Sequence, residues 1–166
     1  MKYLFLYFLS LVFAADDNAP LNRTKDRHVD IKHIKINVSV DLKTKSVFGY
    51  VTHTLSPLKN ELKSFTLDGD DMIIRRVRMK DQDLEFNHSG NKIHIELPNT
   101  IGWNDTVDVR IDYSAYPRKG TYFFGPDETY PDQPWQAWTQ GETEDNHHWV
   151  PLYDYPNERA TFETIL

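Results

Sequence analysis

The sequence contains no cysteine among its 166 residues, so neither disulfide bonds nor a thiol nucleophile are available to it. Such a chain must be stabilised by an apolar core, and its 39% hydrophobic and 13% aromatic content is sufficient for one domain. Basic residues are outnumbered by acidic ones. The formal net charge of −6 and the lack of a basic stripe indicate that nucleic acid is not a partner.

The sequence also lacks the short motifs of several enzyme classes. There is no His-Glu-x-x-His zinc motif, Gly-x-Ser-x-Gly element, phosphate-binding loop or dinucleotide fingerprint. The adjacent pair His147-His148 is the obvious metal candidate, but neighbouring side chains diverge on both strands and helices and rarely bind one ion together. We expect these two histidines to be packed or solvated, and the others to lie on the surface. The sequence therefore predicts no catalytic residue, metal ligand or cofactor within this chain.

One long apolar run is present, and it lies at the N-terminus. Lys2 precedes the apolar residues 3–13, and the small residue Ala14 follows them, a pattern typical of a signal peptide over residues 1–15. The run is shorter than the ~20 residues of a membrane-spanning helix, so a membrane anchor is the less favoured alternative. The sequence predicts a secreted or periplasmic protein with no membrane contact beyond the signal peptide. The polar residues 16–27 are expected to form a flexible lead.

From His28 onwards, apolar and polar residues alternate with the period of two that is typical of half-buried β-strands. Residues 28–40 and 46–55 flank a turn and predict an antiparallel hairpin, with a β-bulge near Lys32-His33 where the alternation changes phase. A helical turn is expected within residues 143–150. Further strands are expected at residues 64–68, 72–79, 84–86, 92–97, 106–113, 120–125 and 160–166. The prediction for residues 28–166 is an all-β fold, an antiparallel, saddle-like β-sandwich.

The segment from residue 135 to 164 is the richest in chemistry, with three tryptophans, a double histidine and several carboxylates. Glu142 follows a glycine in a predicted turn between Trp138 and Trp149. A carboxylate among aromatic side chains is well placed to hold a cation, by charge and by partial desolvation. Pairing of Glu142 with Asp154, as in a carboxylate-dependent hydrolase, is the weakest interpretation because their spacing fits no known arrangement.

The same segment resembles the end of the N-terminal domain of the aminopeptidase N family, zinc aminopeptidases related to leukotriene A4 hydrolase. The family pattern is Thr-Gln-x-Glu, then separated Pro, Asp and Pro positions, then a basic residue followed by Ala-Thr-Phe. Leu152 stands where many members have cysteine. The residues of this chain that match are Thr139, Gln140, Glu142, Pro151, Asp154, Pro156 and residues 159–162.

The resemblance implies that Glu142 binds the free α-ammonium group of a peptide substrate and that Gln140 lines the pocket for its first side chain. The substrate's N-terminus would thus be a partner only through the full-length enzyme. Zinc is expected in the catalytic domain, whose motifs are absent from this chain. The β-domain is therefore expected to be truncated at its C-terminal edge, with the apolar residues 161–166 unpaired and no activity in isolation.

An alternative remains open at this point. The chain could be a free-standing secreted β-sandwich module that binds peptide termini or carbohydrate through its exposed tryptophans. A module of that kind is expected to pair its last strand, whereas a fragment is expected to leave it unpaired.

Overall fold

The computed structural model describes residues 25–166, so the predicted signal peptide, residues 1–15, lies outside the described residues. The predicted flexible lead lies outside them too, apart from its last three residues. Lys25 places its Nζ 2.6 Å from Glu144 Oε2, and Arg27 donates a 2.6 Å hydrogen bond to the carbonyl of Asn157. The last residues of the expected lead are therefore held by Glu144 and Asn157, which its polar composition does not indicate.

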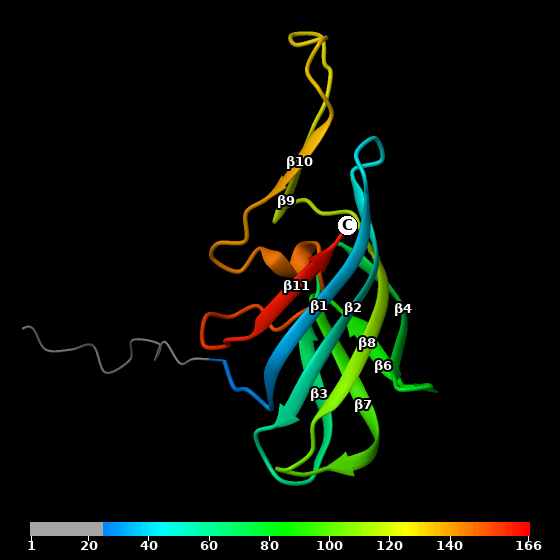
Figure 1. Cartoon of the computed structure of the whole chain (residues 1–166), viewed down its shortest axis with the longest axis vertical. Coiled ribbons are helices and arrows are strands. Elements are labelled where there is room, and N and C mark those ends of the chain that lie inside the picture. The colour runs from blue at the N-terminus through cyan, green and yellow to red at the C-terminus, as the bar shows by residue number, and fades with distance from the viewer. Residues whose placement is uncertain (1–24) are drawn as a thin grey trace, which may run out of the picture.

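Six strands form the larger sheet, in the order β11-β1-β2-β8-β4-β5 (Figure 1). All neighbouring pairs are antiparallel except β11 and β1, which are parallel. β1 and β2 form the predicted hairpin, and the predicted bulge is confirmed by a register shift between Ile31 and His33. The strands are β1 (Val29–Asp41), β2 (Ser46–Pro57), β4 (Met72–Met79), β5 (Gln82–Asp83), β8 (Val107–Ala115) and β11 (Thr161–Ile165).

Three antiparallel strands form the second sheet, in the order β3-β7-β6. These are β3 (Leu62–Asp68), β6 (Phe86–Ser89) and β7 (Lys92–Ile101). Alternate residues of both sheets enter one apolar core, to which β7 contributes Ile93 and Ile95 and β8 contributes Val109 and Ile111. The predicted all-β sandwich is therefore confirmed. Within residues 25–166, no helix has the length and apolar character needed to cross a membrane.

A third, two-stranded sheet projects from one end of the sandwich (Figure 1). It pairs β9 (Thr121–Phe124) with β10 (Gln136–Thr139), and the short 3-10 helix η1 (Asn146–His148) lies near its base. Trp138 stacks on Tyr122 and Phe124, with ring centroids 4.7 and 6.1 Å apart. The hairpin thus carries a row of stacked aromatic rings out from the body of the domain.

The structure differs from two strand predictions, at residues 84–86 and at the C-terminal end of β7. The chain changes sheets at the first place, and the pairing of β7 with β3 is irregular at the second. Of the strand expected at residues 84–86, Leu84 and Glu85 instead cross from β5 in one sheet to β6 in the other, which begins at Phe86, and the buried Leu84 lies in the core. β7 continues through Pro98 to Ile101, beyond the strand expected at residues 92–97. Pro98 is tolerated because it falls where the pairing of β7 with β3 shifts register, so its missing N–H breaks no ladder bond.

The expectation that residues 161–166 are unpaired is also wrong. Thr161 to Ile165 form β11, which pairs with β1 between His33 and Asn37. The Lys35 ammonium and Glu163 carboxylate, 2.6 Å apart, add an exposed ion pair to this ladder. β11 is an edge strand, and the apolar side chain of Phe162 is exposed.

Candidate functional site

Gln140 and Glu142 lie in the loop that connects β10 to η1. The Gln140 N–H donates to the carbonyl of Gly120 at 3.0 Å, and the Asp145 N–H donates to the carbonyl of Gly141 at 3.0 Å. Both predicted site side chains are exposed. Within residues 25–166, neither side chain forms a hydrogen bond or an ion pair. The backbone of the loop is therefore held, while the two side chains are available to a ligand.

Two glycines allow this loop to pack closely against its neighbours. A Cβ on Gly141 would lie 2.2 Å from the Asn146 side chain, which also accepts a 3.3 Å hydrogen bond from the Trp149 indole. Gly120 has φ +73°, and a Cβ there would lie 2.0 Å from the carbonyl oxygen of Asp145. The contact at Gly120 is with backbone and requires the absence of a side chain, whereas a Cβ on Gly141 would require the Asn146 side chain to move.

We expect Gly120→Ala to lower the free energy of unfolding by about 2 kcal/mol, because it combines a positive φ with a backbone clash. Gly90 is the matched control, since its φ is +59° but no atom lies within 4 Å of the added Cβ. Gly90→Ala should cost about 1 kcal/mol, from the backbone conformation alone. Urea unfolding of both variants measures the difference. Equal losses would show that the contact with Asp145 does not constrain the loop.

Asp154 links the segment that follows the loop, through His147, to Asp68 of β3. Its Oδ2 accepts hydrogen bonds from the backbone N–H and from Nδ1 of His147, at 3.0 and 2.9 Å. Its own N–H donates to Asp68 Oδ2 at 3.0 Å, and Asp68 is also paired with the Lys92 ammonium. Hydrogen bonding to Asp154 raises the pKa of His147. Asp154 is 6% exposed and bonded throughout, so it does not share a cleft with Glu142 as a hydrolase pair would.

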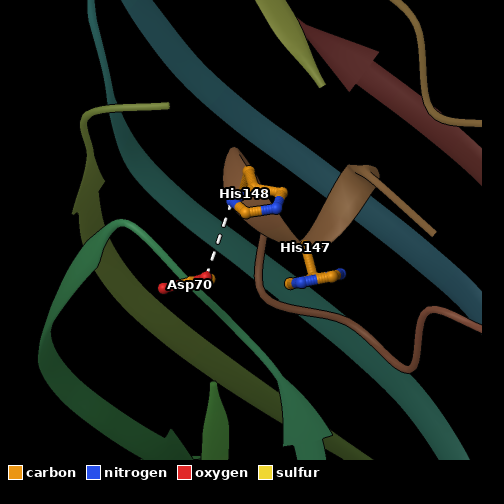
Figure 2. Close-up of side chains that lie close together, drawn as sticks. All are labelled: Asp70, His147 and His148. Atoms are coloured by element: carbon orange, nitrogen blue, oxygen red, sulfur yellow. Dashed lines mark ion pairs between the residues drawn. The ribbon is translucent and has the colours of Figure 1, made fainter. Parts of the chain in front are cut away.

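The structure brings together two histidines that we expected to diverge. His147 and His148 stack with ring centroids 4.6 Å apart, and Asp70 lies beside them (Figure 2). One potential ligand atom from each of the three residues lies within 4.8 Å of the other two. The sequence contains no signal for this cluster, because Asp70 comes from the turn after β3, far from η1 along the chain.

The expectation that every other histidine lies on the surface is wrong for His53. This residue is 0% exposed, and its Nε2 donates a 2.8 Å hydrogen bond to the carbonyl of Pro151. Its Nδ1 is buried without a hydrogen-bond partner in residues 25–166. Burial lowers the pKa of His53 to about 4. The neutral side chain thus links β2 to the Pro151 end of the candidate segment.

An apolar pocket of about 450 Å³ lies next to this segment, between β1 and β11 on one side and β10 and η1 on the other. Trp138, Trp149 and Phe162 contribute to its walls, together with alternate residues of β1. Thr139 also lines it, but Gln140 and Glu142 do not. The predicted site residues therefore lie outside the pocket, on the exposed loop.

Residues 30–166 match the model of the peptidase M1 N-terminal domain family. The chain belongs to this family. The resemblance inferred from residues 138–163 is therefore confirmed, and it extends across both sheets of the sandwich. The peptidase M1 N-terminal domain is the N-terminal domain of zinc aminopeptidases of the M1 family.

Individual relatives of this M1 N-terminal domain are distant. Leukotriene A-4 hydrolase of Xenopus laevis is 28% identical over 95 residues, which cover 54% of this chain and 16% of that protein. Among solved structures, yeast LTA4 hydrolase in complex with bestatin has a TM-score of 0.72 at 17% identity, covering 82% of this chain and 22% of that one. The M1 zinc metallopeptidase of Deinococcus radiodurans has a TM-score of 0.68 at 19% identity, covering 83% and 32%.

These likenesses establish the shared fold of the M1 N-terminal domain. The chain spans about one sixth of the curated relative and between about one fifth and one third of the solved chains. The roles of Gln140 and Glu142 stay predictions, since likeness at this identity concerns the fold.

Proposed function

We propose that this domain forms the part of a zinc aminopeptidase active site that binds the amino terminus of a peptide substrate. Glu142 would bind the α-ammonium group, and Gln140 would line the pocket for the first side chain. The observation that carries the proposal is the exposed Glu142 carboxylate, unpaired within residues 25–166, on a loop whose backbone is fixed at Gln140 and Gly141.

The chemistry of this arrangement suits an exopeptidase. An ammonium group and a carboxylate form a charge-assisted hydrogen bond, which is stronger than one between neutral groups. A carboxylate on a fixed loop measures the distance from the substrate's amine to the reacting carbonyl, so only peptides with a free N-terminus are positioned for cleavage. Glu142 would therefore contribute both binding energy and selectivity.

Zinc is expected in the catalytic domain, outside the sequence of this chain. There it would polarise the scissile carbonyl and activate a water molecule. A peptide substrate is supported by one structural relative: the E323A mutant of the Deinococcus radiodurans enzyme has been solved with a bound Tyr-Ser-Ala substrate, with a TM-score of 0.67 and 21% identity to this chain.

A free-standing binding module is the second candidate, and the stacked rings of Tyr122, Phe124 and Trp138 favour it. Trp138 is 50% exposed, so this row could stack against a sugar or a peptide side chain. An unpaired last strand would have argued against a module. Because β11 is paired with β1, that argument does not apply. Family membership now gives the aminopeptidase domain the preference.

Export is a further part of the proposal, supported by the signal-peptide pattern of residues 1–15. In a host that secretes the protein, we expect N-terminal sequencing of the exported product to begin at Ala15 or Asp16. Exported protein that retains Met1, or protein found only in the cytoplasm, would contradict this expectation.

A further inference from the structure

We propose that Asp70, His147 and His148 form a binding site for a divalent transition-metal cation of the Zn²⁺ type. Figure 2 shows the three side chains converging from the turn after β3 and from η1. The backbone N–H of Asp70 donates to the carbonyl of His147 at 2.9 Å, which holds the two segments together before any ion binds.

Hydrogen bonds to carboxylates hold both histidine rings in place. His147 Nδ1 donates to Asp154 Oδ2 at 2.9 Å, and His148 Nδ1 donates to Asp71 Oδ2 at 2.8 Å. Metal-binding histidines commonly donate one ring N–H to a carboxylate in this way, because the bond fixes the tautomer and the orientation of the ring. For His147 this leaves Nε2 with a lone pair, as metal coordination requires. The His148 atom that faces Asp70 is the same Nδ1, 3.9 Å from Asp70 Oδ2, so a cation bound there would displace the proton that His148 shares with Asp71.

The supporting carboxylates are themselves held in place. Asp154 and Asp71 are both largely buried; Asp154 also donates its N–H to Asp68, and Asp71 accepts from the Arg118 guanidinium at 2.6 Å. Removing a carboxylate that hydrogen-bonds a metal-binding histidine lowers metal affinity by about 10- to 100-fold. The cluster thus combines three candidate ligands with two carboxylates that hold the histidine rings in position.

The separation of the ligand atoms is compatible with a cation after a small movement. Zinc–nitrogen and zinc–oxygen bonds of about 2.0–2.2 Å place tetrahedral ligands about 3.3–3.5 Å apart, closer than the 4.8 Å limit seen here. The Asp70 side chain is 35% exposed and can turn inward. Its present cationic neighbour, Arg118, lies 3.6 Å away and is 73% exposed, so an ion could displace it into solvent.

The donor set indicates which cations the site should prefer. Two imidazoles and one carboxylate suit Zn²⁺, Co²⁺ or Ni²⁺, whereas Mg²⁺ and Ca²⁺ require six or more oxygen ligands. A water molecule would complete the fourth position. The preference separates this site from a nonspecific acidic surface, which would bind Mg²⁺ and Ca²⁺ as well.

Isothermal titration of the complete chain with ZnCl₂, and separately with MgCl₂, tests the proposal. We expect one Zn²⁺ per chain and no saturable Mg²⁺ binding. Asp70→Asn keeps the shape of an exposed side chain and should weaken Zn²⁺ binding at least about tenfold. His148→Gln should do the same. His94→Gln is the control, because His94 also lies beside a carboxylate, Glu96 at 2.8 Å, but on β7 away from the cluster.

Cobalt supplies a second readout that a loss of packing alone would not imitate. Co²⁺ bound by the three ligands should give the visible absorption of a low-coordinate site, and this should disappear in Asp70→Asn while the circular dichroism stays unchanged. Failure of the wild-type chain to bind Zn²⁺, or equal binding by wild type, Asp70→Asn and His148→Gln, would overturn the proposal. Neither result depends on the role proposed for Glu142.

Discussion

Glu142→Ala should lower kcat/KM about 30- to 1,000-fold in the full-length enzyme that we propose carries this domain. The change removes a charge-assisted contact with the substrate's ammonium group, for which a loss of about 2–4 kcal/mol is expected. Each 1.36 kcal/mol corresponds to about a factor of ten in rate. Hydrolysis of an aminoacyl substrate with a chromogenic leaving group measures the effect.

The loss should be specific to the position of the charge. Glu128 is an exposed glutamate between β9 and β10, and it provides the matched control. Glu128→Ala removes the same charge and should leave kcat/KM within about twofold, because exposed charges distant from a site are largely screened. Similar losses in both variants would mean that Glu142 acts only through the general acidity of this end of the domain.

The free energy of unfolding should fall by roughly 3 kcal/mol between about pH 7 and about pH 4 because of His53 alone. Above pH 6.5 the His53 imidazole is neutral in both the folded and the unfolded chain. Its contribution to the free energy of unfolding therefore does not change with pH in that range. Between 6.5 and about 4, the unfolded chain takes up a proton that the folded chain does not, which favours unfolding as the pH falls. A difference of about 2.5 in pKa corresponds to roughly 3 kcal/mol.

The His53→Gln variant isolates this contribution. Glutamine can still donate a hydrogen bond to the Pro151 carbonyl, but it does not titrate. Urea unfolding at several pH values should therefore show a much shallower acid loss in the variant than in the wild type. The carboxylates titrate in both proteins, so their effects cancel in the comparison. Parallel pH profiles for the two proteins would show that His53 is protonated without penalty in the folded state.

The strands that alternate strictly between buried and exposed residues were predictable from the sequence. β4 has the predicted bounds, and the hairpin of β1 and β2 is found with its bulge, because half-buried strands in a sandwich carry the period-two pattern. β10 was missed because all four of its residues are exposed, so no alternation marks it. The parallel pairing of β11 with β1 was missed because it joins segments at opposite ends of the chain.

The residues of the candidate site also differ in whether the sequence could reveal them. Gln140 and Glu142 could be singled out because they belong to a local motif with recognisable spacing. The cluster of Asp70 with His147 and His148 could not, because it depends on the long-range backbone bonds between Asp68 and Leu152 that align the two segments. The burial of His53 was equally invisible, since its polar side chain occupies a core position of β2.

The most direct test of the account is a crystal structure of the full-length enzyme with a bound peptide that has a free amino terminus. The account predicts a Glu142 carboxylate oxygen about 2.7–2.9 Å from the peptide's α-nitrogen, with Gln140 beside the first side chain. A complex in which other groups bind the α-ammonium while Glu142 points into solvent would contradict it.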